Sequence, residues 1–205
     1  MTSSYRLGDI IIQDVRDPST NSEILNEHPH SIGSEYILSM NKKNYLNERI
    51  GCVTQIILNH MERYSKLFPP DIGNSTVVHL RLGDAVAGNH FYERRLRPLD
   101  VSYYQLVIPQ GKVYVIGKCH FGRRDSSPNY EECVDLSNRY MMYILNTLGA
   151  KHFDGGTADI DLCCAIKAKH FVQGKGFYSQ LIVEVRRCLG LKSIETRSHN
   201  FEIVN

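Results

Sequence analysis

The sequence lacks any long uninterrupted run of apolar residues. No stretch of the 205 residues approaches the roughly eighteen apolar residues of a membrane-spanning helix. The polar start, residues 1–9, leads only into Ile10-Ile11-Ile12, which is too short for the apolar core of a signal peptide and has no small-residue cleavage site behind it. We therefore expect a soluble, cytoplasmic protein without a membrane span.

A strong charge of one sign is also missing. The 24 basic and 22 acidic side chains leave a formal net charge of +2. Because so small a charge creates no field that would hold nucleic acid or an anionic membrane, we expect no nucleic-acid partner, and any anion must be bound locally. The 42% of apolar residues is enough to bury a core, which excludes a wholly disordered chain.

Regular cysteine spacing is absent. The six cysteines include no Cys-x-x-Cys pair, so we interpret them as reduced thiols and expect no metal. Cys163 and Cys164 are adjacent on a predicted helix and should point to different sides. The full set is Cys52, Cys119, Cys133, Cys163, Cys164 and Cys188.

Two common nucleotide-binding fingerprints are missing as well. No Gly-x-Gly-x-x-Gly follows the first strong strand pattern, and the chain has no P-loop Gly-Lys-Ser. Both absences argue against a dinucleotide-binding or a P-loop protein. No internal repeat or low-complexity tract is present either.

What the sequence does contain is a strand that ends in polar groups. The β-branched run from Val77 breaks at Gly83-Asp84, and it carries His79 and Arg81, which are two residues apart and therefore share one face of a strand. Ligands of open α/β sheets bind outside the carboxyl ends of the strands. An imidazole and a guanidinium there suit an anion such as a diphosphate. Alone, His79 would be interpreted as a core histidine and Arg81 as a member of a structural ion pair.

From about residue 76, strand and helix patterns alternate along the chain. This alternation predicts an α/β fold with a doubly wound, Rossmann-like parallel sheet. The predicted strands are 77–82, 112–117, 151–153 and 170–173, with an edge strand in 193–204, and the predicted helices are 100–107, 131–148, 157–168 and 178–189.

The first third of the chain is less regular. Its clearest element is a helix from about 45 to 67, which Pro69-Pro70 ends, whereas residues 14–34 read as a long irregular segment. Residues 5–9 read first as a turn before a strand; as a binding turn they would offer Arg6, Gly8 and Asp9 to a substrate. We expect an N-terminal part, 1–75, and a Rossmann-like domain, 76–205.

Three loops should meet at the carboxyl edge of the sheet: 81–84, 117–124 and 173–179. In the third, Gly174-Lys175-Gly176 precedes a helix, where free backbone N–H groups and the helix dipole favour a phosphate. Before an earlier helix, Thr157 with Asp159 and Asp161 reads as an N-terminal cap.

Two motifs resemble those of one enzyme family. His79-x-Arg81-x-Gly83-Asp84 is similar to the His-x-Arg-x-Gly/Thr-Asp motif of the GDP-fucose fucosyltransferases, the superfamily of α1,2-, α1,6- and protein O-fucosyltransferases. The segment 161–170, with the later Gly174, Gly176, Phe177 and Ser179, is similar to that family's second nucleotide motif. The resemblance covers roughly residues 76 to 190.

The resemblance implies a GT-B-type fold with a reduced N-terminal part. It also implies inverting, metal-independent transfer of fucose or a similar sugar from a GDP-sugar donor to a glycan hydroxyl, without a cofactor. Arg81 would contact the donor's β-phosphate, His79 a phosphate or ribose oxygen, and Asp161 the guanine edge, with Asp159 as the rival. Asp84 would orient Arg81 or meet ligand hydroxyls, and the diphosphate would be held by Tyr178, Ser179 and the amides of Gly174 to Gly176.

The chain departs from the family at a second cation. Many members have Arg-Arg where this chain has Arg81-Leu82, so the other cation would come from Arg94, Arg95 or Arg123. The catalytic base stays open among Asp84, Glu93 and Asp9.

Three other functions stay open. One is a binding module that keeps the nucleotide pocket without acceptor chemistry. Another is a metal-dependent transferase using Asp159-x-Asp161, and the third is a hydrolase or phosphotransferase acting on a sugar phosphate.

Overall fold

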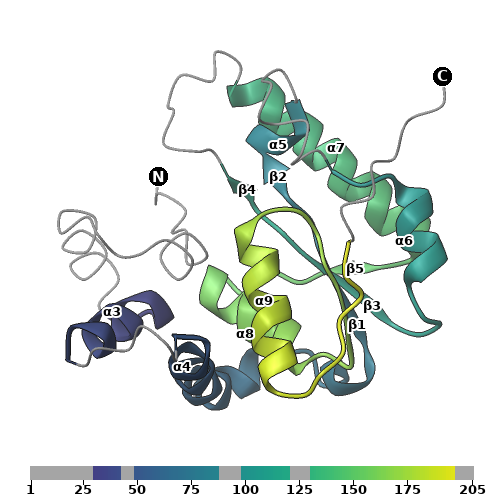
Figure 1. Ribbon diagram of the computed structural model, residues 1–205. Helices are drawn as coiled ribbons and strands as arrows, with labels where there is room; N and C mark the ends of the chain where they lie inside the picture. Colours follow the sequence, from purple (N-terminus) through teal and green to yellow (C-terminus); the bar gives the residue numbers. More distant parts are fainter. Residues whose placement is uncertain (1–29, 43–48, 88–97, 121–129, 197–205) are drawn as a thin grey trace.

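The computed structural model is a mixed α/β fold (Figure 1) and describes residues 30–42, 49–87, 98–120 and 130–196. Its strands are β1 (Thr76–His79), β2 (Leu82–Gly83), β3 (Val113–Ile116), β4 (Cys119–His120), β5 (Lys151–His152) and β6 (His170–Val172). Its helices are α3 (Ile32–Lys42), α4 (Arg49–Tyr64), α5 (Asp84–Ala87), α6 (Val101–Val107), α7 (Tyr130–Leu148), α8 (Ala158–Lys167) and α9 (Phe177–Cys188), with 3-10 turns η1 (Ser65–Leu67) and η2 (Ile72–Asn74).

The main sheet has four parallel strands in the order β5-β3-β1-β6. The chain builds outward from β1 to β3 and β5, and then crosses to the other side of β1 to add β6. The carboxyl ends of β1 and β6 therefore form the point where the strand order reverses, which is the usual ligand site of such sheets. Val172 and Ile194 form one further parallel bridge. It falls in the predicted edge strand, whose residues 197–204 lie outside the described part.

Helices cover both faces of this sheet, which confirms the predicted α/β parallel-sheet architecture (Figure 1). Val77 of β1 faces a core formed with α4, α8 and α9, whereas Val78 faces a second core formed with α6 and α7. This alternation along β1 is the period of two expected of a strand. Because both faces are covered, β1 and β3 are buried along their whole length.

Local capping explains where two predicted helices begin. The Asp100 carboxylate accepts a hydrogen bond of 2.8 Å from the Ser102 amide at the start of α6. The Thr157 hydroxyl accepts one from the Ile160 amide at the start of α8, which confirms the predicted cap. Each cap satisfies a backbone N–H that has no partner within its helix.

The described N-terminal residues contain a helix that the sequence did not predict. α3 begins at Ile32, inside the segment read as irregular, and the Ile32 amide donates to Asp159 Oδ2 at 2.9 Å. The bond to Asp159 leaves no local sequence signal. Ser31 does leave one, because its Oγ accepts a hydrogen bond of 3.1 Å from the Ser34 amide and so acts as an N-cap that the reading of 14–34 as irregular missed. Ile32 and Tyr36 of α3 belong to the same core as α4, α8 and α9, and the domain boundary at residue 75 stays a prediction.

The cysteines of α8 and α9 differ in burial. Cys163 and Cys164 point to different sides, as predicted: the Cys163 thiol donates to the Ile57 carbonyl of α4, whereas Cys164 lies near Tyr114 of β3. Both thiols are fully buried, because α8 is enclosed by α4, α9 and the sheet. Cys188, the last residue of α9, is exposed. Arg186 is fully buried instead.

The predicted strand 77–82 is in fact two short strands. β1 ends at His79, and pairing resumes at Leu82, which is opposite Cys119 in a second, two-stranded parallel sheet of β2 and β4. The expected turn at Gly83-Asp84 is the junction between β2 and the short helix α5. Within the described ranges, no helix is both long and apolar enough to cross a membrane.

Candidate functional site

His79 lies at the carboxyl end of β1, on the face covered by α8 and α9. Its imidazole is 6% exposed, and its ring centroid is 5.2 Å from that of Tyr178 on α9. Burial, followed by the neighbouring Arg81 charge, lowers the pKa of His79 to about 3. The imidazole is therefore neutral at physiological pH, so it can offer an N–H donor or a lone pair but not a positive charge.

The loop after β6 packs directly on His79. A Cβ atom on Gly174 would lie 2.2 Å from the His79 carbonyl oxygen and 2.7 Å from its Nδ1, so only glycine fits there. The Gly174 amide donates to the buried Ser179 Oγ at 2.8 Å. No described residue hydrogen-bonds to His79 Nδ1, which is buried. The predicted phosphate loop and the predicted histidine are thus brought together.

Arg81 adjoins the start of α9. A Cβ atom on Gly176, the residue before this helix, would lie 3.7 Å from both Cδ and Nη1 of Arg81. The φ angle of +89° at Gly176 is one that residues with a side chain rarely adopt. The guanidinium therefore lies beside a helix N-terminus, and both favour negative charge.

Tyr178 connects the site to α8. Its hydroxyl donates to the Ala158 carbonyl at 2.6 Å, while its ring faces His79. Burial, with Asp161 and Asp159 nearby, raises the pKa of Tyr178 well above its ordinary value. Tyr178 therefore supplies a ring to the site, and its hydroxyl already has a partner.

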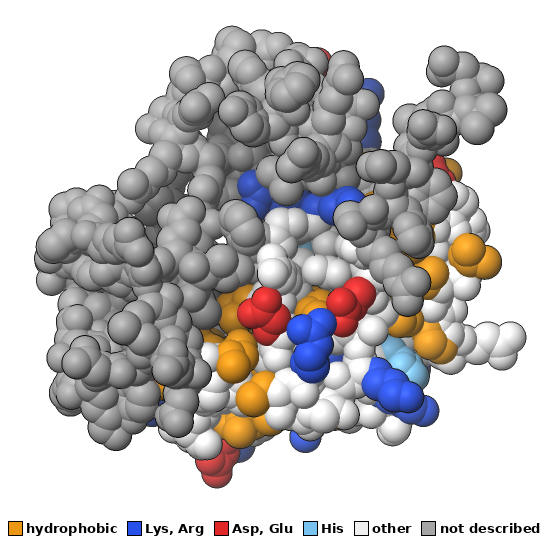
Figure 2. All heavy atoms as spheres, viewed as in Figure 1, with side chains coloured by type: hydrophobic (Ala, Val, Ile, Leu, Met, Phe, Trp, Pro, Cys, Tyr) orange, Lys and Arg blue, Asp and Glu red, His pale blue; other side chains and the backbone are white. Residues whose placement is uncertain are grey.

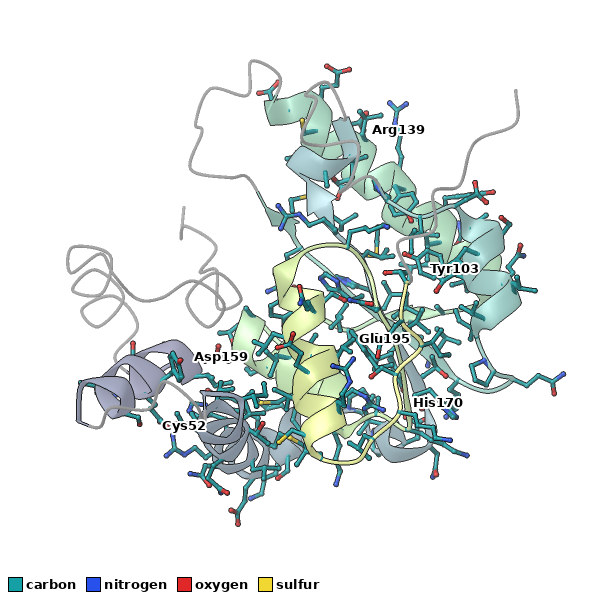
Figure 3. The ribbon with its side chains drawn as sticks, in the orientation of Figure 1. Cys52, Tyr103, Arg139, Asp159, His170 and Glu195 are labelled. Carbon is teal, nitrogen blue, oxygen red and sulfur yellow. The ribbon has the colours of Figure 1, made fainter. Side chains whose placement is uncertain are left out.

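Asp161 and Asp159 each hold a different backbone segment. Asp161 is 4% exposed, and its Oδ1 accepts from the Gly155 amide at 2.8 Å; burial raises its pKa to about 6. Asp159 points toward α3 and accepts from the Ile32 amide (Figure 3). Two residues apart on one helix, the two carboxylates serve segments on different sides.

Lys118 is a residue of this edge that belongs to no sequence motif. It follows β3, and its Nζ lies 2.7 Å from Asp154 Oδ1 in the loop after β5. The Lys118 charge also acts on Asp161, where it lowers the pKa and partly offsets burial. The available signal was its place directly after the Gly that ends the second predicted strand.

Other predicted site residues lie elsewhere. The Gly83 amide donates to Ser137 Oγ of α7 at 2.9 Å, so this amide is directed toward the opposite face of the sheet. Asp84 is the first residue of α5, and its side chain is not among those described. The remaining candidates, Arg6, Gly8, Asp9, Glu93, Arg94, Arg95 and Arg123, lie outside the described residues.

Charge on the face that carries α9 is mixed. Figure 2 shows acidic and basic side chains next to one another near the middle of this face. Arg187 of α9 and Glu195 after it form an ion pair 2.9 Å apart. Among the described residues no group of three or more His, Cys, Asp or Glu side chains is placed to hold a metal ion.

The arrangement as a whole suits a small anion. It combines a guanidinium, a glycine loop that opens a helix and a neutral buried imidazole at the strand-order reversal. An anion can be neutralised there by Arg81 and oriented by backbone amides. No protein-family model matches the chain, and neither does any curated protein sequence.

Proposed function

We propose that this protein is a glycosyltransferase that moves fucose, or a similar sugar, from a GDP-sugar to a hydroxyl of a glycan. The observation that carries the proposal is the junction of the two motifs: Gly174 packs on His79, and Gly176 lies beside Arg81. These are the segments whose residues resemble the two nucleotide motifs of the GDP-fucose fucosyltransferases. A GT-B-type arrangement, with the acceptor side in the reduced N-terminal part, belongs to the same proposal.

Arg81 would act on the leaving group. As the bond to the sugar breaks, negative charge develops on the GDP diphosphate, and a fixed guanidinium beside a helix N-terminus stabilises that charge. Such stabilisation needs no metal. His79 would bind a phosphate or ribose oxygen as a neutral N–H donor, in line with its low pKa.

The carboxylates support nucleotide recognition better than metal binding. Asp159 and Asp161 accept backbone N–H groups from segments far apart in sequence, so they are not turned toward one common ligand. Asp161 remains the candidate for the guanine edge, since Tyr178 lies near it as well as near His79. Inversion would also require a base on the acceptor hydroxyl, and Asp84, Glu93 and Asp9 remain candidates for it.

Calorimetric titration with GDP, UDP and GDP-fucose in EDTA tests the nucleotide site. We expect GDP and GDP-fucose to bind without metal and Arg81→Ala to weaken both by at least about tenfold, since a charge-assisted phosphate contact is lost. Arg139→Ala is the matched control, because this exposed arginine lies on α7, on the other face of the sheet (Figure 3).

Release of GDP from GDP-fucose, with and without glycan acceptors, tests the chemistry. Acceptor-dependent release supports transfer, whereas binding without release identifies a non-catalytic nucleotide-sugar-binding module. Binding of UDP alone, or only with manganese, contradicts the proposal and reopens the Asp159-Asp161 pair as a metal site.

A further inference from the structure

Arg81 and Lys118 occupy opposite positions in two gaps between strands, Arg81 between β1 and β2 and Lys118 between β3 and β4. His79 pairs with Ile116 before the break in the sheet, and Leu82 pairs with Cys119 after it. The difference in residue number between the paired residues is the same before and after the break. Residue 81 therefore lies opposite residue 118. The close approach of Gly117 to the Leu80 carbonyl oxygen, 2.6 Å from an added Cβ, fits this register.

Both residues lie near the helix N-termini at which the site is predicted. Arg81 lies beside Gly176, at the start of α9. Lys118 acts electrostatically on Asp161, in the first turn of α8. Neighbouring positions of paired parallel strands are roughly 4.8 Å apart, a spacing that two linked phosphoryl groups can bridge.

We propose that Lys118 is the second cation of the site and that, together with Arg81, it binds a diphosphate rather than a single phosphate. The inference rests on the proposed function and extends it, because Lys118, between β3 and β4, supplies a second positive charge for the second phosphate. Lys118 is a binding residue for the donor's diphosphate.

Asp154 is the present partner of Lys118 and would yield to the ligand. The Asp154 side chain is half exposed, and the Lys118 side chain is 39% exposed. An ion pair this accessible to water contributes little to stability, so a diphosphate can replace the carboxylate at small cost. The liberated Asp154 keeps its second contact, since its Oδ1 also accepts from the Gly156 amide.

The test compares Lys118→Gln with Asp154→Asn by calorimetry, using GDP, GMP, inorganic pyrophosphate and inorganic phosphate as ligands. We expect Lys118→Gln to weaken GDP and pyrophosphate by about tenfold and to leave GMP and phosphate within about twofold. Asp154→Asn should leave GDP binding unchanged or tighten it, because it removes the competing carboxylate. A purely structural ion pair would instead give the same loss from both substitutions.

The same strand offers a matched control. Lys112, at the amino end of β3, is likewise exposed and paired with an aspartate, Asp71, but it lies at the opposite edge of the sheet. Lys112→Gln should leave all four affinities unchanged.

Three outcomes separate this inference from the proposed function. If Arg81→Ala weakens GDP binding and Lys118→Gln does not, the inference fails and the function stands. If pyrophosphate binds in a Lys118-dependent way and GDP does not, the cation pair stands and the nucleotide function fails. If the protein binds neither GDP nor pyrophosphate, both fail.

Discussion

Gly174 lies so close to His79 that a Cβ atom at position 174 would come within 2.2 Å of the His79 carbonyl oxygen. The obstacle is backbone, which cannot rotate away as a side chain would. We therefore expect Gly174→Ala to lower the free energy of unfolding by about 1–3 kcal/mol, the usual cost of overpacking, or more. Urea denaturation measures the change.

Gly51 is the control for that substitution. It lies exposed in α4, and a Cβ atom there would meet nothing within 4 Å. Gly51→Ala should stabilise the protein by roughly 0.5–1 kcal/mol, because alanine is the better helix former. Equal effects of the two substitutions would contradict the close packing of the loop on β1.

Asp161→Asn should stabilise the protein at neutral pH. Burial raises the pKa of Asp161 from 3.8 to about 6, so between these values the folded state binds more protons than the unfolded state and stability falls as pH rises. At pH 7 the carboxylate costs up to about 3 kcal/mol. Asparagine keeps an oxygen to accept the Gly155 amide and removes the charge.

Unfolding of wild type and Asp161→Asn in urea at pH 4 and pH 7 checks this. The gain should be present at pH 7 and largely absent at pH 4. Asp71 gives the opposite sign, since its hydrogen bond with Lys112 lowers its pKa, and Asp71→Asn should destabilise at pH 7. An Asp161→Asn variant that is less stable than wild type at pH 7 would contradict the prediction.

His79 should make the protein sensitive to mild acid. Burial lowers the pKa of His79 to about 3, so from pH 6.5 downward the unfolded state binds a proton that the folded state does not, and stability falls with pH. The expected loss is about 2 kcal/mol between pH 7 and pH 5. His79→Gln should lack this component of the pH dependence.

Denaturation of wild type and His79→Gln at pH 7 and pH 5 measures the difference. The difference between the two proteins at pH 7 gives the effect of lost packing, which is subtracted from the difference at pH 5. An NMR titration of the imidazole gives an independent reading. A His79 ring that protonates near pH 6.5 in the folded protein would refute the expectation.

Substitution of Arg186 should strongly destabilise the protein. Arg186 is fully buried and donates to the Ala165, Ile166 and Ala168 carbonyls at 2.8–3.0 Å. It also donates to the Lys169 and Lys192 carbonyls and to Ser193 Oγ. It thereby satisfies the end of α8 and holds the segment after α9. Arg186→Met should cost about 3–5 kcal/mol, because buried carbonyls are left without partners.

The adjacent Arg187 is the matched control. It is 64% exposed and paired with Glu195, so Arg187→Ala should cost less than about 1 kcal/mol. Thermal and urea unfolding of both variants give the comparison. A small effect of Arg186→Met would show that water can replace the guanidinium at these carbonyls.

The sequence predicted what depends on neighbours along the chain. The parallel sheet follows from the alternation of strand and helix patterns, and Thr157 could be recognised as a cap from its own position. It could not predict features made by residues far apart, such as the hydrogen bond from the Ile32 amide of α3 to Asp159. Arg186 looked like an ordinary basic residue near a helix end, and only the fold encloses it.

The same limit applies to the site. His79, Arg81 and the 174–179 loop were found because each has a local pattern, and the structure brings these together. Lys118 belongs to no motif, and only the strand register places it opposite Arg81. The low pKa of His79 was not foreseen either, because burial depends on α9 and the loop before it.

The break between the two sheets also limits how this chain can tolerate insertions. Strand pairing resumes in the same register on the far side of the break, so residues 80–81 and 117–118 form a two-residue spacer of equal length on each strand. Because side chains alternate from face to face, one added residue in either spacer would turn Arg81 or Lys118 to the opposite face while both sheets could still pair. Related chains that use this edge in the same way should therefore keep both spacers at equal length, even where the loops around them vary.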